Sequence, residues 1–132
     1  MNKEIKARWI ERLRSGNYRQ VGGPLHCNKG GFCALGVLAD IYLEDHGEQW
    51  QRTGGANYFI TQERQHPRMG RVVDECYSTL PFRVAEWAEI SPGAQDDIAV
   101  MNDELGEPRS EAGYLQHVND FNKIADWIEK YL

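Results

Sequence analysis

The first candidate site is a glycine-rich turn that leads into a helix. Lys29, Gly30 and Gly31 come directly before Phe32 and Cys33, where an apolar helical pattern begins. A helix N-terminus presents free N–H groups and the positive end of the helix dipole, both of which attract anions. We therefore expect an anion-binding corner here. The segment lacks the glycine spacing of a P-loop, and the alternative is a plain hairpin turn that leads into a core helix.

Side chains that lie nearby in the sequence would complete this site. Arginine binds phosphate, and an aromatic ring stacks on a base, so together they hold a nucleotide. The expected ligand is therefore small, anionic and nucleotide-like. The expected ligand-binding residues are Arg12, Tyr18, Gln20, Lys29, Gly30, Gly31 and Cys33.

Cys33 also allows a second kind of chemistry. A thiol at a helix N-terminus has a lowered pKa and is a better nucleophile. Cysteine hydrolases pair such a thiol with a histidine base, and His117 is the main candidate, with His26 and His66 as others. The alternative is that Cys33 packs as a small apolar residue, as most cysteines do. We therefore expect a non-enzymatic protein and keep a hydrolase that uses Cys33 and His117 as the alternative.

The cysteines and histidines do not form a metal-binding pattern. The chain has three cysteines, Cys27, Cys33 and Cys76, and zinc sites usually show a Cys-x-x-Cys or a His-x-x-x-His pair, which this sequence lacks. An odd number of cysteines without a secretory signal indicates reduced thiols. We expect no metal and no cofactor.

The charge of the chain is uneven. Seven of the fifteen Lys and Arg residues and two of the twenty acids lie in residues 1–30, so this segment carries +5 within a net charge of −5. A basic segment on an acidic body indicates an anion site or an acidic partner, unless its cations merely solvate the first helix. A general nucleic-acid binder would be basic overall, so nucleic acid is not expected as a partner.

Nothing in the sequence indicates a membrane or a secreted protein. No run of eighteen apolar residues occurs, and the first residues form an acid-containing helical pattern rather than a secretory signal. We therefore expect a cytoplasmic protein with no membrane partner. Assembly into a homo-oligomer stays open.

Periodicity predicts an α+β fold: a compact, mostly helical single domain, residues 1–132, with a small β-hairpin or short antiparallel sheet. The apolar repeats and capping residues predict helices at 3–15, 34–44, 80–89, 95–104 and 120–132. The first has an apolar stripe of Ile5, Trp9 and Leu13 with Asn2 as its cap, and the second is apolar nearly all round and should be the central buried helix. The third is expected to be capped by Ser78 or Thr79 and ended by Ser91-Pro92-Gly93; a polar stretch is expected over 105–116, and Asn119 or Asp120 as the cap of the last helix. Short strands are expected at 58–61 and 71–77, and an extended or hairpin segment at 17–32. Gly36 inside a helix indicates close approach by another backbone or a ligand.

Two stretches of sequence resemble a known family. The first contains Leu13-Arg14-Ser15-Gly16-Asn17-Tyr18 and then Gly31-Phe32-Cys33-Ala34-Leu35-Gly36-Val37-Leu38. The second contains Leu80-Pro81, then Met101-Asn102-Asp103, then Phe121 to Glu129. The chain resembles small uncharacterised proteins of phage and prophage genomes, which read "FCCLGVL" early and "LND…F..IA..IE" late. It departs from them at Ala34, where a second cysteine is usual, and in a longer link over 104–120.

The resemblance implies an accessory protein of a mobile element, working in the host cytoplasm and possessing an anti-defence role. Together with the basic segment, it favours a non-enzymatic protein that binds a host factor or a small anionic nucleotide-like ligand. A third hypothesis is a protein-interaction module that uses exposed aromatic residues of the 45–70 segment.

Overall fold

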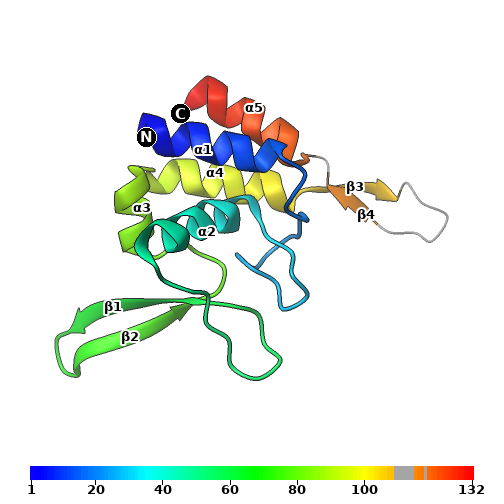
Figure 1. Cartoon of the computed structure of the whole chain (residues 1–132). Coiled ribbons are helices and arrows are strands. Elements are labelled where there is room, and N and C mark those ends of the chain that lie inside the picture. The colour runs from blue at the N-terminus through cyan, green and yellow to red at the C-terminus, as the bar shows by residue number, and fades with distance from the viewer. Residues whose placement is uncertain (109–114, 118) are drawn as a thin grey trace.

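The computed structural model describes residues 1–108, 115–117 and 119–132, and it is α+β and mostly helical, as predicted. Figure 1 shows helices packed side by side, with two hairpins that project from them. The helices are α1 (Lys3–Arg14), α2 (Ala34–His46), α3 (Phe82–Ala88), α4 (Pro92–Asp103) and α5 (Phe121–Tyr131). The strands are β1 (Ile60–His66), β2 (Gly70–Cys76), β3 (Leu105–Pro108) and β4 (Leu115–His117).

Helix α2 is the central buried helix, as its nearly continuous apolar sequence predicts. Nine of its residues are buried, among them Val37, Leu38 and Ile41, which are fully inaccessible. The helix ends at His46, and the following residue, Gly47, has a left-handed conformation (φ 65°) that lets its N–H bond back to the last turn. Because α2 is apolar on most sides, other elements must cover most of its surface.

Helices α1 and α5 run side by side along one layer of the molecule (Figure 1). In α1 the predicted stripe of Ile5, Trp9 and Leu13 is buried, and the Trp9 indole N–H donates to the carbonyl of Ala34 at the start of α2 (2.9 Å). The predicted cap also forms, because the Asn2 side chain accepts from the N–H of Ile5. These contacts fix the position of the first turn of α2.

The hairpin of β1 and β2 is longer than predicted. A short strand was expected at 58–61, but β1 pairs antiparallel with β2 from Ile60, opposite Cys76, to His66, opposite Gly70. The hairpin projects away from the helices (Figure 1), and all of its strand residues except Ile60 and Cys76 are exposed or partly exposed. Because the projecting part of the hairpin buries little, residues 62–66 are all polar. The sequence there has no alternation of apolar and polar residues from which a strand could be predicted. The two strands are instead linked by backbone bonds and exposed ion pairs.

The boundary between α3 and α4 also differs from the prediction. Helix α3 starts at Phe82 after Pro81, with no side-chain cap, rather than at a cap on Ser78 or Thr79. Ser91 and Pro92 were expected only to end this helix, but they begin α4, where the Ser91 hydroxyl accepts from Ala94 N–H. Serine followed by proline is a helix start as well as a stop.

Two loop segments differ as well. In residues 17–32 the expected reversal forms, with an antiparallel bridge between His26 and Phe32 around the glycine turn, but the rest is held by isolated bridges such as Gln20 with Phe32 and not by a regular hairpin. The polar stretch expected over 105–116 contains β3 and the start of β4, which pair antiparallel. Within the part of the chain that the structure describes, no helix is long and apolar enough to cross a membrane.

Candidate functional site

The N-terminus of α2, where an anion was expected, is capped by the chain's own side chains. The N–H of Ala34 donates to Oδ1 of Asn102 (3.1 Å), and the N–H of Gly36 contacts Sγ of Cys33 (3.4 Å). Asn102 comes from the end of α4 and is 1% exposed. Side-chain caps of this kind satisfy N–H groups that would otherwise attract a ligand.

Gln20, which is partly exposed, belongs to the same arrangement. Its amide donates to Oδ1 of Asn102 (3.1 Å) and to the carbonyl of Asn119 (3.0 Å). The amide of Asn102 in turn donates to the carbonyl of Val21 (2.9 Å). We call Gln20 and Asn102 with these partners the Asn102 clasp; it joins the 17–32 segment, α2 and α4. Gln20 is thus a structural residue here.

Cys33 is buried and poorly suited to nucleophilic chemistry. Its side chain is 5% exposed, and burial raises the pKa of its thiol to about 11, so it is protonated at neutral pH. It borders a cavity of about 290 Å³ together with Asn102 and Asp103. The proposed base, His117, is in β4, but its side chain lies outside the described residues. The geometry therefore favours Cys33 as a packing and capping residue.

Gly36 makes room for a backbone and not for a ligand. A Cβ atom placed on Gly36 would lie 1.7 Å from the carbonyl oxygen of Leu25. Leu25 is fully buried, and its carbonyl also accepts from the N–H of Cys33 (3.2 Å). The close approach expected at Gly36 is therefore that of the segment before α2.

The glycine turn forms at the surface. The N–H of Gly30 donates to the carbonyl of Cys27 (2.9 Å), and the N–H of Cys27 donates to the carbonyl of Gly31 (2.7 Å). Gly30 has φ 95°, a conformation that favours glycine. Lys29 and Gly30 are exposed at the tip, while Gly31 is buried against Val21. The turn therefore presents Lys29 to solvent.

Arg12 and Tyr18 do come together, but an acidic pair accompanies them. Arg12 donates to the Tyr18 hydroxyl (3.1 Å) and forms an ion pair with Glu44 (2.7 Å). The Tyr18 hydroxyl donates to Asp40 (2.7 Å), and the indole of Trp50 donates to the other oxygen of that carboxylate (2.9 Å). Arg12 and Tyr18 line a cavity of about 380 Å³, in which the charge of Arg12 is already balanced.

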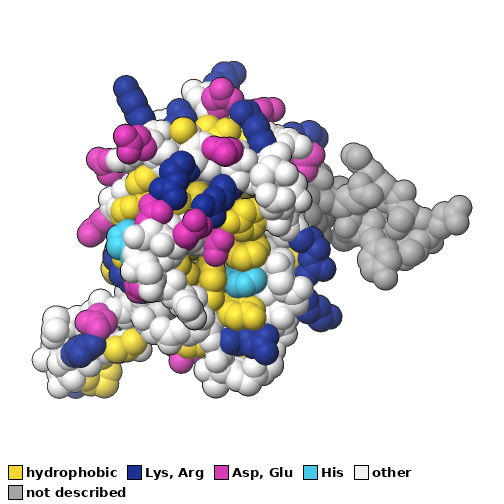
Figure 2. Space-filling view, viewed as in Figure 1, with side chains coloured by type: hydrophobic (Ala, Val, Ile, Leu, Met, Phe, Trp, Pro, Cys, Tyr) yellow, Lys and Arg dark blue, Asp and Glu magenta, His cyan; other side chains and the backbone are white. Residues whose placement is uncertain are grey.

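Tyr18 is one of five rings that form a continuous group, which we call the ring cluster. His26 is stacked between Phe32 (3.9 Å between centroids, planes 8° apart) and Tyr58 (4.2 Å, 11°). Trp50 meets His26 edge-on (5.1 Å), and Tyr18 meets Phe32 edge-on (5.0 Å). All five rings are partly exposed. On the face drawn in Figure 2, hydrophobic side chains surround a histidine, and basic side chains border them.

His26 is held in one orientation at the centre of this cluster. Its Nδ1 lies 3.0 Å from the carbonyl of Gly31, which identifies Nδ1 as the protonated nitrogen. Burial lowers the pKa of His26, and the bond to Gly31 offsets this only in part. The ring is therefore neutral at pH 7.

Three exposed cations lie beside the ring cluster. The guanidinium of Arg52 sits 5.2 Å over the ring of Tyr58. The carbonyl of Arg19 accepts from the N–H of Phe32, and the side chain of Arg19 donates to the carbonyl of Lys29 (3.1 Å). None of the three has an ion-pair partner within the described ranges. Their charges are available to an anionic partner.

The structure thus divides the expected ligand-binding residues among three places. Gln20 belongs to the Asn102 clasp, Cys33 caps the first turn of α2 beside it, and Arg12 and Tyr18 contact Asp40, while Lys29, Gly30 and Gly31 form the turn at the third place. Sequence reasoning missed the ring cluster because its members lie far apart along the chain; the available signal was the aromatic content of the 45–70 segment. Among the described residues, no three His, Cys, Asp or Glu side chains gather as metal ligands would.

Comparison with known proteins gives a family. No curated protein and no solved structure matches the chain. The model of one family, described as a domain of unknown function (DUF8296), matches residues 1–132. Because this match covers the whole chain, the protein belongs to the DUF8296 family.

Proposed function

We propose that this chain is a non-enzymatic binding protein of a phage or other mobile element, and that it captures a host protein through the ring cluster. The observation that carries the proposal is the five partly exposed rings bordered by unpaired cations. Tyrosine, tryptophan, phenylalanine and arginine are enriched in protein interfaces and supply most of their binding energy.

The rings are held in place before any partner binds. The hydroxyl of Tyr18 and the indole N–H of Trp50 both donate to Asp40, and His26 is fixed by the carbonyl of Gly31. Binding to a preorganised surface costs little conformational entropy, so more of the contact energy appears as affinity. This arrangement suits recognition better than a cluster of freely rotating side chains would.

The charges indicate the chemistry of the partner. Arg19, Lys29 and Arg52 have no carboxylate partner among the described residues, whereas Arg12 is paired with Glu44. An acidic patch on the partner would complement the first three cations and would speed its association. The partner is therefore a host protein with an acidic surface.

The setting of the proposal rests on the sequence motifs around Phe32 to Leu38 and Met101 to Asp103, which resemble those of phage and prophage proteins. A small accessory protein of this kind acts in the host cytoplasm, and a component of host defence is the partner we propose there.

A pair of matched double variants tests the surface. Arg52→Ser with Tyr58→Ser removes a cation–ring pair from the ring cluster. Lys130→Ser with Tyr131→Ser removes the equivalent pair on α5, where the Lys130 ammonium lies 5.1 Å over the ring. Each immobilised protein is used to capture proteins from bacterial host lysate.

We expect the same host protein on the wild type and on the α5 variant, and at least tenfold less of it on the Arg52 and Tyr58 variant. Tenfold corresponds to about 1.4 kcal/mol of binding free energy. Equal retention by both double variants, or no captured protein on the wild type, would contradict the proposal.

A thermal-shift series with cyclic and linear nucleotides separates a protein partner from a small anionic ligand. We expect no nucleotide to raise the melting temperature of the wild type. If a nucleotide does raise the melting temperature, and both Arg12→Ala and Lys29→Ala abolish this rise, the partner is a small nucleotide-like ligand and not a host protein.

A further inference from the structure

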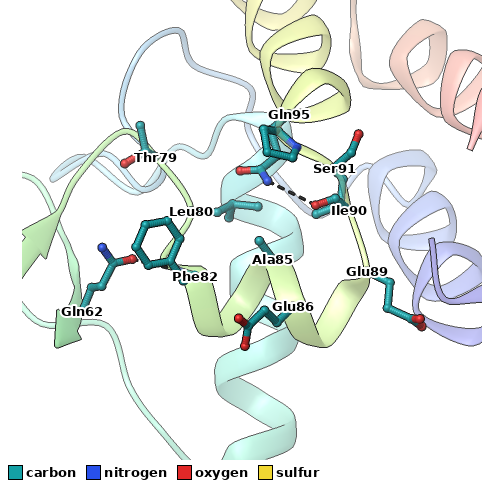
Figure 3. A pocket seen from close by; sticks show the side chains of 11 residues that line it. Gln62, Thr79, Leu80, Phe82, Ala85, Glu86, Glu89, Ile90, Ser91 and Gln95 are labelled. Carbon is teal, nitrogen blue, oxygen red and sulfur yellow. Dashed lines mark hydrogen bonds between the residues drawn. The ribbon is translucent and has the colours of Figure 1, made fainter. Parts of the chain in front are cut away.

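A second surface, which shares no residue with the ring cluster, lies along α3 and the start of α4. It is a cavity of about 630 Å³, and its apolar lining includes Leu80, Phe82, Ala85 and Ile90. In Figure 3, Leu80, Phe82 and Ala85 lie near one another, while Glu86 and Glu89, which also line the cavity, project from α3. Phe82 is 66% exposed, so its ring is open to a partner at this cavity.

The edge of this groove is acidic. Glu86 and Glu89 are both exposed, and neither has an ion-pair partner in the described part of the chain. By contrast, Arg83, the cation of α3, is engaged by Glu48 (2.6 Å). The groove therefore combines an apolar floor with two unbalanced negative charges.

Glu89 is held in a conformation that a glycine would adopt more easily. It has φ 55° and ψ 42°, and among the described residues it is the one non-glycine residue with positive φ. It occupies the position just after α3, where its own N–H and that of Ile90 bond back to the helix, and glycine is the usual residue there. A non-glycine residue keeps this conformation only where its surroundings hold it there, and such residues cluster at ligand-binding sites.

We propose that this groove is a docking site for a cationic peptide segment of a partner protein. A large apolar side chain of the peptide lies between Phe82 and Ile90, and its flanking Lys or Arg side chains reach Glu86 and Glu89. The charge of the groove excludes an acidic segment, so its occupant differs from the acidic surface that suits the ring cluster. The inference does not depend on the function proposed for that cluster.

The test uses the isotopically labelled full chain and three amidated hexapeptides. The first is Lys-Lys-Leu-Phe-Lys-Lys, the second replaces every Lys with Glu, and the third replaces Leu-Phe with Gly-Ser. We expect the first peptide to produce saturable shifts in the amide signals of Ala85, Glu86 and Ile90, and the other two to produce none. Shifts elsewhere only, or equal shifts with either control peptide, would overturn the proposal.

Variants connect the strain to the binding. Glu89→Gly should raise the melting temperature by about 2–4 °C because it relieves the left-handed strain, and it should lower the affinity for the first peptide at least threefold. Glu86→Gln combined with Glu89→Gln should lower this affinity at least tenfold, whereas Glu4→Gln, on α1, should leave it unchanged. Unchanged affinity in Glu89→Gly, or no gain in its stability, would overturn the reasoning.

Discussion

Asn102→Ala is the substitution whose effect follows most directly from the structure. Asn102 is 1% exposed, and the change removes the acceptor of the Ala34 N–H and the donor to the Val21 carbonyl. A buried backbone group left without a partner costs about 1–3 kcal/mol. Ala34 is fully buried and Val21 only partly, so we expect a loss of about 2–4 kcal/mol from a total of about 5–15 kcal/mol.

Urea unfolding of the two proteins measures this loss through the shift in midpoint at constant slope. Asn119→Ala is the matched control, because the Asn119 amide bonds to the carbonyl of Met101 (3.2 Å) from a partly exposed position. The control should lose less than about 1 kcal/mol. If Asn102→Ala loses no more than Asn119→Ala, the Asn102 clasp does not hold α2 as described.

Three further predictions concern the segment before α2 and the first turn of that helix. Gly36→Ala should destabilise by at least about 2 kcal/mol in urea, because its Cβ would lie 1.7 Å from the oxygen of Leu25; a gain would contradict the packing. Iodoacetamide should label Cys27 in the native protein well before Cys33, whose pKa is raised to about 11 by burial; the reverse order would revive a reactive Cys33. Burial lowers the pKa of His26 in the folded protein below the ordinary value of about 6.5 that it has in the unfolded chain. The neutral ring therefore contributes to the free energy of unfolding above about pH 6.5, and this contribution should be lost as the pH falls through the lower pKa of the folded state. Between pH 7.5 and pH 5 the melting temperature should fall less for His26→Phe than for the wild type. An equal fall in both proteins would contradict the lowered pKa of His26.

The sequence predicts well those elements whose physical signals are local. The stripe of Ile5, Trp9 and Leu13 and the Asn2 cap define α1 within one residue of the prediction, and of the two caps expected for α5, Asn119 or Asp120, the structure has Asp120. Residues 62–66 gave no such signal, because both faces of the projecting hairpin meet solvent and need no apolar alternation.

The site was harder to predict because it depends on contacts between distant segments. Asn102 meets Ala34 across 68 positions, and His26 lies between Phe32 and Tyr58 only after the 45–59 loop folds back. A helix N-terminus preceded by glycines does indicate an anion site, but only when no side chain of the chain caps it first. At α2, Asn102 provides that cap.

The central claim is that the ring cluster is the surface that meets the partner, and photocrosslinking tests it directly. A photoreactive phenylalanine analogue replaces Tyr58 in one protein and Tyr131, which is 60% exposed on α5, in another. After irradiation in host lysate, we predict that the analogue at position 58 links reproducibly to one host protein and that the analogue at 131 does not. Crosslinks from position 131 alone, or from neither position, would contradict the claim.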